Sequence, residues 1–311
     1  MILFRLCVAA LLASTLTSTT VSREVAMTID DLPTISVLGN DLEAAQQTTT
    51  ALLAALARNQ VPAIGFVNEG KLRTDGQVDP RRVALLRQWL DSGFELGNHT
   101  FSHADFHSTP LDTYERQVLD GEKVTGQLLR ERGKRIRYFR HPFLHTGRSA
   151  PERQRFETFL KEHHYTIAPI TIDNYDYVFA AAYDRAGARD DPKAQENIAD
   201  AYISYMEAVT AYYEQQSVAI VGREVRQTLL IHASALNAAT LDRLASMFRA
   251  RGYRFVPLDR ALEDPAYRHR DEYYGPAGIT WLHRWAMTDG KRGTIFVGEP
   301  PVPEWIEQAS R

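Results

Sequence analysis

The chain has 311 residues, of which 44% are hydrophobic and 24% are charged, a composition typical of a soluble globular protein with a sizeable core. Its formal net charge of -3, without a local run of Lys or Arg, argues against a nucleic-acid-binding protein. Cys7 is the only cysteine in the sequence, which excludes a disulfide framework and a zinc site built from several cysteines.

Residues 1–22 have the layout of a secretory signal peptide. Arg5 supplies a positive charge, an apolar stretch begins at residues 6–12, and small Ser and Thr residues follow up to Ser22. The apolar stretch is too short to span a bilayer, and no later segment has the pattern of a transmembrane helix. A buried first helix is the alternative interpretation. We expect the mature protein to be exported, either into the periplasm or out of the cell.

Short apolar runs then alternate with amphipathic helical patterns. Strands are predicted at residues 24–29, 63–67, 94–96, 138–139, 165–172, 228–231 and 255–256. Helices are predicted between them, with starts marked by Asn40 and Glu43 as a capping box, by Asp79 before Pro80, and by Asn237. Repeated strand–helix units with apolar strands imply an α/β fold with a parallel sheet, open or closed into a barrel.

Two segments interrupt this alternation. Residues 180–227 hold a polar stretch and then an amphipathic helix with one apolar stripe, formed by Ile198, Tyr202, Tyr205, Val209 and Tyr212. We interpret the stripe as helix packing, with a sugar-stacking rim as the alternative. Residues 264–311 form a tail that contains several prolines and tryptophans.

Chemically reactive side chains follow the predicted strands. Asp30 and Asp31 end the first strand, and two adjacent carboxylates are hard to bury together unless a metal ion or another cation lies nearby. A solvated acidic turn is the alternative. His99 and His103 are four residues apart and can converge on one metal ion. With a carboxylate they would form an open site, in which a divalent cation lowers the pKa of a bound water to about 7.

Two further motifs occupy strand ends. Arg140 follows the strand at 138–139 and can pair with a carboxylate. His232 directly follows the strand at 228–231, and a single histidine at a strand end is more often structural than catalytic. Because α/β barrels carry their catalytic loops at the carboxyl ends of their strands, the set of motifs indicates one active site.

Five motifs between residues 24 and 260 resemble, in order, those of the polysaccharide deacetylases (NodB homology domain, carbohydrate esterase family 4). The matches are Thr28–Pro33 with TFDDGP, His99–His103 with H-[ST]-x-x-H, Arg140–Phe143 with R-x-P-[YF], Asp173–Tyr177 with D-x-x-D-W, and Leu230–His232 with L-x-H. The resemblance implies a distorted (β/α) barrel of the NodB-homology type.

The resemblance also implies roles for these residues. Asp30 would be the general base, oriented by Arg140, while Asp31, His99 and His103 would bind one divalent metal ion. Zinc is the expected ion, with Co²⁺, Ni²⁺ and Fe²⁺ as alternatives.

The remaining roles concern the leaving group and the substrate. His232 would be the general acid, with Asp173 tuning its pKa. The implied substrate contacts are the backbone after Pro142, at Phe143, for the oxyanion, and Tyr177 and Leu230 for the acetyl methyl group. Nearby histidines interpreted as loop residues or substrate contacts, not as ligands, are His107, His141 and His145.

The chain departs from the family pattern at Leu32, where a glycine is usual, at Leu144, where a glycine is usual, at Tyr177 in place of tryptophan, and at Ala233 in place of aspartate. None of these changes removes an implied ligand, base or acid. They alter the pocket wall and the loops, and therefore bear on the substrate more than on the reaction.

We predict a deacetylase domain at residues 23–263 with a helical insertion at about 180–227, and a C-terminal extension at 264–311 that packs on the barrel. The expected activity is metal-dependent removal of acetyl groups from N-acetylated, or O-acetylated, carbohydrate polymers or oligomers such as peptidoglycan and chitin-like glycans. The alternatives are a non-catalytic glycan-binding relic and a two-His-one-carboxylate iron oxygenase.

Overall fold

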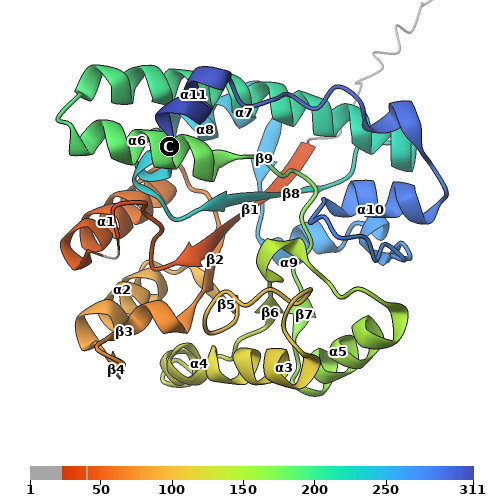
Figure 1. The fold of residues 1–311 in the computed structure, drawn as a ribbon, viewed down its shortest axis with the longest axis horizontal. Helices are drawn as coiled ribbons and strands as arrows, with labels where there is room; N and C mark the ends of the chain where they lie inside the picture. The colour runs from red at the N-terminus through yellow and green to blue at the C-terminus, as the bar shows by residue number, and fades with distance from the viewer. Residues whose placement is uncertain (1–22, 40) are drawn as a thin grey trace, which may run out of the picture.

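The computed structural model describes residues 23–39 and 41–311, which form a curled sheet surrounded by helices (Figure 1). The predicted signal peptide at residues 1–22 and the predicted helix cap Asn40 lie outside the described residues. No helix in the described part of the chain is both long enough and apolar enough to cross a membrane.

Within the described residues the main sheet has seven strands: β1 (Arg23–Leu32), β2 (Ala63–Val67), β5 (Glu95–Asn98), β6 (Tyr138–Phe139), β7 (Thr166–Ile167), β8 (Gln227–His232) and β9 (Tyr253–Phe255). Their order is β7-β6-β5-β2-β1-β8, with β9 also on β1, and every pairing is parallel. A parallel bridge between Ile172 and Leu229 links the chain after β7 to β8, so the sheet nearly closes on itself. The predicted distorted α/β barrel is confirmed.

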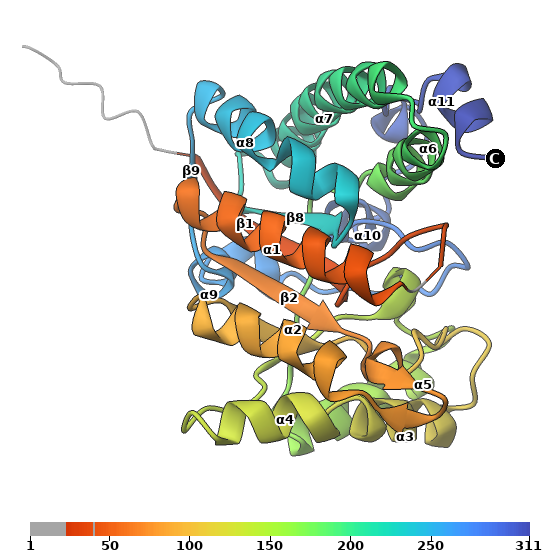
Figure 2. The same cartoon turned by 90° about the vertical axis from the view of Figure 1, so that its left-hand side faces the viewer.

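A separate antiparallel pair consists of β3 (Arg73–Thr74) and β4 (Gln77–Val78). The α-helices are α1 (Leu42–Arg58), α2 (Pro80–Asp91), α3 (Leu111–Asp120), α4 (Lys123–Arg130), α5 (Ala150–Glu162), α6 (Asp176–Ala188), α7 (Pro192–Val221), α8 (Ala235–Ala250), α9 (Leu258–Leu262), α10 (Trp281–Thr288) and α11 (Glu304–Ala309). Figure 2 shows α8, α1, α2 and α4 side by side around one side of the sheet.

Helix starts follow local capping signals, although not always the predicted ones. Asp79 caps α2 as predicted, since its carboxylate accepts a backbone hydrogen bond in the first turn. Asp41 caps α1 in the same way. The prediction of Asn237 as the cap of α8 is wrong, because Ser234 provides a side-chain acceptor three residues earlier and the Asn237 amide donates to it at 3.2 Å.

The segment predicted as an insertion is helical. It contains the C-terminal part of α6 and all of α7, which is 30 residues long. The predicted stripe is buried at every position: Ile198, Tyr202, Tyr205, Val209 and Tyr212. The helix-packing interpretation is therefore confirmed. In the C-terminal tail, α10 packs on α7 and α11 packs on α6, so the last residues lie against these helices.

Leu32 is the residue that stands where the family pattern has a glycine, and its side chain is fully buried at the end of β1. The neighbouring strand β2 has a glycine, Gly65, beside it. A Cβ atom on Gly65 would lie 2.4 Å from Leu32 Cδ2. The extra side chain at position 32 therefore occupies the space that a side chain at position 65 would need.

We predict that Gly65→Ala lowers the free energy of unfolding by about 1–3 kcal/mol, the usual cost of overpacking a core. In a Leu32→Ala background the same substitution should cost much less, because the clashing methyl group is gone. Urea unfolding of the four proteins of this double-mutant cycle measures the coupling. Equal costs in the two backgrounds would show that the two positions do not share this space.

Candidate active site

Strand register brings the predicted residues to one edge of the sheet. β1 and β8 pair so that Asp30 lies directly opposite His232. β5 pairs with both β2 and β6, and His99 and Arg140 are the residues that follow β5 and β6. Because all these strands are parallel, their carboxyl ends meet in one place, as the sequence predicts.

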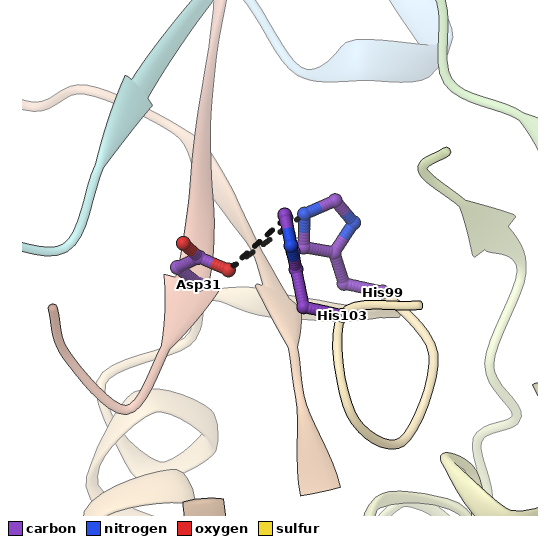
Figure 3. Close-up of side chains that lie close together, drawn as sticks. All are labelled: Asp31, His99 and His103. Atoms are coloured by element: carbon purple, nitrogen blue, oxygen red, sulfur yellow. Dashed lines mark ion pairs between the residues drawn. The ribbon is translucent and has the colours of Figure 1, made fainter. Parts of the chain in front are cut away.

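Asp31, His99 and His103 converge in space (Figure 3). Asp31 Oδ1 lies 3.8 Å from His99 Nε2 and 3.7 Å from His103 Nε2, and it has no hydrogen-bond partner although it is buried. The imidazole planes are inclined at 72°, so in-plane lone pairs of both rings can point at one ion. This donor set fits a divalent cation that keeps a coordination position open.

Both histidines are held in the form that binds metals. His99 Nδ1 lies 2.8 Å from the Arg140 carbonyl oxygen and donates to it, which leaves the Nε2 lone pair facing Asp31. Burial, followed by the charge of His103, holds the pKa of His99 well below its usual range. Burial also lowers the pKa of His103. Neutral imidazoles therefore face the carboxylate.

Asp31 owes its orientation to a backbone irregularity. The β1–β2 register shifts between Ile29 and Leu32, and Asp31 has a φ of 70°. A bulge of this kind re-aims side chains, and it lets Asp30 and Asp31 line the same cavity although they are neighbours in the chain. Burial alone would raise the pKa of Asp31, but Lys71, with its Nζ 3.5 Å from Oδ1, and the two histidines lower it.

Sequence analysis missed Lys71. It lies in the short 3₁₀ helix Glu69–Leu72 after β2, where no motif marks it, and its ammonium group also donates to the Asp31 carbonyl at 2.9 Å.

Asp30 is only 2% exposed. Its Oδ2 lies 3.2 Å from Arg140 Nη1, and its Oδ1 has no hydrogen-bond partner. Arg140, itself fully buried, is fixed by further bonds to Thr28 Oγ1 and the Ala168 carbonyl, both at 2.8 Å. Burial raises the pKa of Asp30 to about 6, and Arg140 opposes that rise. Arg140 therefore contacts Asp30 as predicted, and one carboxylate oxygen stays available.

His232 is held by Asp176, at the first residue of α6. His232 Nδ1 lies 2.7 Å from Asp176 Oδ1, and the backbone amide of His232 donates to Oδ2 at 2.7 Å. Asn237 donates to Oδ2 as well, at 2.7 Å. Burial would lower the pKa of His232, but the charge and the hydrogen bond of Asp176 outweigh it and raise the pKa to about 9.

This arrangement corrects the role given to Asp173. The motif Asp173–Tyr177 contains two aspartates, and it is Asp176 that contacts His232. Asp173 instead accepts a bond from its neighbour, the Asn174 amide, at 2.9 Å and lines the cavity. Burial raises the pKa of Asp173 to about 7, and the charge of Glu299 adds to the rise.

The site opens into a cavity of about 540 Å³. Of the predicted substrate contacts, Phe143, Tyr177 and Leu230 line it, whereas Pro142 is buried and is not part of its wall. Phe143 is 53% exposed and Tyr177 48%. Tyr175, which sequence analysis did not select, is a third exposed ring at the cavity. The cavity is therefore lined by exposed aromatic rings as well as by charged and polar side chains.

A second cluster lies beside the cavity. Asp105, His107 and His145 also bring ligand atoms within 4.8 Å of one another. Here the two rings stack in parallel, at 3.9 Å and 7°. An imidazole lone pair lies in its ring plane, so parallel rings cannot share one ion without rotation, unlike His99 and His103. This geometry agrees with the interpretation of His107 and His145 as non-ligands.

We predict that the protein binds one equivalent of Zn²⁺ and that His103→Ala loses it, because that substitution removes one of three ligands. His107→Ala is the matched control and should bind zinc as the wild type does. Titration calorimetry with zinc chloride measures both. Two equivalents in the wild type would show that the cluster of Asp105, His107 and His145 also binds zinc. Loss of zinc only in His107→Ala would show that the ion binds there and not at Asp31, His99 and His103.

We predict that Asp176→Asn lowers the pKa of His232 and that Asp173→Asn changes it far less, as followed by NMR on metal-free protein. The folded-state pKa of about 9 lies above the ordinary 6.5, so protonated His232 stabilises the fold fully below pH 6.5 and loses this effect as pH rises through about 9. Asp176→Asn should abolish that pH dependence of stability. A larger effect of Asp173→Asn would show that Asp173, and not Asp176, sets the pKa of His232.

Residues 17–157 match the family model of the polysaccharide deacetylases. Over 95 residues the chain is 30% identical to a chitooligosaccharide deacetylase of Sinorhizobium fredii, an alignment that covers 30% of this chain and 40% of that protein.

Solved structures with a similar fold include a peptidoglycan N-acetylglucosamine deacetylase, at TM-score 0.50 and 18% identity over 76% of this chain and 87% of that chain. A CE4 family pseudoenzyme from Bacillus anthracis matches at TM-score 0.49 and 14% identity, over 78% and 66%. The matched residues 17–157 carry the aspartate pair, both histidines of the triad and Arg140, so this part of the chain is similar to the polysaccharide deacetylase family in most of the residues that form the site.

Proposed function

We propose that the protein is a metal-dependent hydrolase that removes acetyl groups from N-acetylated carbohydrate polymers or oligomers, with O-acetylated ones as the alternative. The observation that carries the proposal is a single cavity lined by a two-His-one-Asp triad, by Asp30 and by His232. The 30% identity to a chitooligosaccharide deacetylase supports a substrate built from N-acetylglucosamine.

Asp31, His99 and His103 would hold the ion, with zinc expected and Co²⁺, Ni²⁺ or Fe²⁺ as alternatives. When bound, such an ion would lower the pKa of a water molecule and polarise the acetyl carbonyl group. The neutral state of both imidazoles suits this ligand set, and so does Asp31 Oδ1, which accepts no hydrogen bond.

Asp30 acts as the general base in this proposal. Its Oδ2 is occupied by Arg140, which leaves Oδ1 to take a proton from the attacking water. A carboxyl group with a pKa of about 6 is better matched to proton transfer near neutral pH than an ordinary aspartate, because a general base works best when its pKa lies near the operating pH.

His232 acts as the general acid. An amine leaves poorly unless it is protonated as the C–N bond breaks, and a pKa of about 9 keeps the imidazolium protonated at neutral pH. Because Asp176 accepts from Nδ1, Nε2 is the nitrogen that can give its proton to the leaving group. The register of β1 and β8 puts this acid across from Asp30.

Two alternatives are weaker. A non-catalytic relic would be expected to lack the residues proposed as base and acid, whereas Asp30 and His232 both line the cavity with the triad. An iron oxygenase uses the same ligand types, but has no use for a base held by Arg140 and an acid held by Asp176. We also propose that the enzyme acts outside the cytoplasm, because residues 1–22 have the signal-peptide layout.

We predict that Asp30→Asn retains one equivalent of zinc but lowers the rate of acetate release from N-acetylated chitooligosaccharides by about 10²–10⁴-fold, the usual contribution of a general base. Asp31→Asn, the matched control, should lose the metal as well as the activity. An enzymatic assay of released acetate measures the rate of each variant, and metal analysis measures its zinc content. If Asp30→Asn lost zinc and Asp31→Asn kept it, the two roles would be reversed; an active, metal-free wild type would refute metal dependence.

A further inference from the structure

The loop after β6 has an unusual backbone. Phe143 and Leu144 both have a φ of 55°, in the left-handed region that residues other than glycine seldom adopt. Two consecutive residues of this kind persist only where the surrounding structure holds them. Something outside the loop must therefore fix its conformation.

This conformation leaves one amide available at the cavity. The Leu144 amide donates to the His141 carbonyl at 3.2 Å and the His145 amide to the Pro142 carbonyl at 3.1 Å. Among the described residues, no acceptor is found for the Phe143 amide. Phe143 lines the cavity, and its ring centroid is 4.5 Å from that of His103. A free N–H on a residue whose ring packs against His103 could stabilise negative charge that develops on the acetyl oxygen.

Two buried arginines tie the loop to the C-terminal segment. Arg284 of α10, only 1% exposed, donates to Thr146 Oγ1 and, at 3.4 Å, to the Leu144 carbonyl. Its Nε binds Asp271 Oδ2 at 2.7 Å. Arg153 of α5 donates to the same Thr146 hydroxyl at 2.5 Å and to the Asp271 carbonyl at 2.7 Å. The loop is therefore bound to residues more than a hundred positions further along the chain.

Gly278 makes the closest approach. A Cβ atom built on it would lie 1.8 Å from the Phe143 carbonyl oxygen and 2.9 Å from the carbonyl carbon. These are backbone atoms, so no side-chain rotation could relieve the clash. Only a residue without a side chain can pack against the loop here, and Gly278 itself lines the cavity.

We propose that the C-terminal segment is part of the active site, with Gly278 and Arg284 as positioning residues that hold the Phe143 amide toward the reacting carbonyl. The proposal rests on the proposed deacetylase function and extends it to a segment outside residues 17–157, the part of the chain matched by the family model. Neither residue touches the reacting atoms; both act through the backbone of the loop.

Gly278→Ala tests the proposal, with Ala277→Ser as the matched control, since Ala277 is the exposed neighbour in the same loop. In acetate release from N-acetylated chitooligosaccharides, Gly278→Ala should lower kcat by about 10²-fold, the effect of misplacing a catalytic group by about 1 Å. KM and zinc content should stay at wild-type values, because the oxyanion forms only in the transition state. Ala277→Ser should match the wild type in kcat.

Hydrogen exchange of the amides at residues 143–146 gives a second readout that needs no activity. Gly278→Ala should exchange faster there and nowhere in β1 or β8, whether or not the wild type releases acetate, so a failed proposed function is told apart from a failed positioning role. Wild-type kcat and exchange in Gly278→Ala would overturn the proposal. The proposal would also be overturned if Gly278→Ala lost zinc and had a lower Tm, and if these two changes accounted for its whole loss of kcat. If Gly278→Ala does not fold, Arg284→Met is measured against the same criteria.

Discussion

The candidate active site depends on the burial of two adjacent carboxylates at the end of β1. Like charges this close are costly to bury, and the structure meets the cost with a different cation for each. Arg140 binds Asp30 at 3.2 Å, and Lys71 lies 3.5 Å from Asp31. The bulge at Asp31 turns both side chains into one cavity, so the constraint falls in the region where the chemistry is proposed.

The same cavity therefore contains two carboxyl groups, and also imidazoles, whose pKa values are shifted in opposite directions. The pKa of Asp30 is raised and that of Asp31 is lowered. Among the imidazoles, the pKa of His232 is raised while that of His99 is lowered. Environments that separate the pKa values of two groups of the same type allow one group to act as base or acid while the other keeps a fixed charge state. The proposed division into base, ligands and acid therefore rests on burial and neighbouring charges, and not on residue type.

Apolar runs are local signals, so the sequence predicted several strands closely, but β7 spans only Thr166–Ile167 of the strand predicted at residues 165–172. The bounds of β2 and β6 agree with the prediction, and parallel register then brings Asp30 and His232 together. It could not distinguish Asp176 from Asp173, because the position where α6 begins decides which carboxylate reaches His232.

Contacts between distant segments were also beyond local patterns. Lys71 has no motif around it, and the contact of Gly278 with the loop after β6 joins segments that are more than a hundred residues apart. Such contacts depend on how α10 and the C-terminal tail pack, and not on any periodicity or spacing in the sequence.

Anomalous diffraction at the zinc edge from crystals of the zinc-loaded protein tests the central claim most directly. We expect one strong peak coordinated by Asp31, His99 and His103, with Asp30 still bound to Arg140 and outside the coordination sphere. A peak bound by Asp30, or one located only at Asp105, His107 and His145, would contradict it.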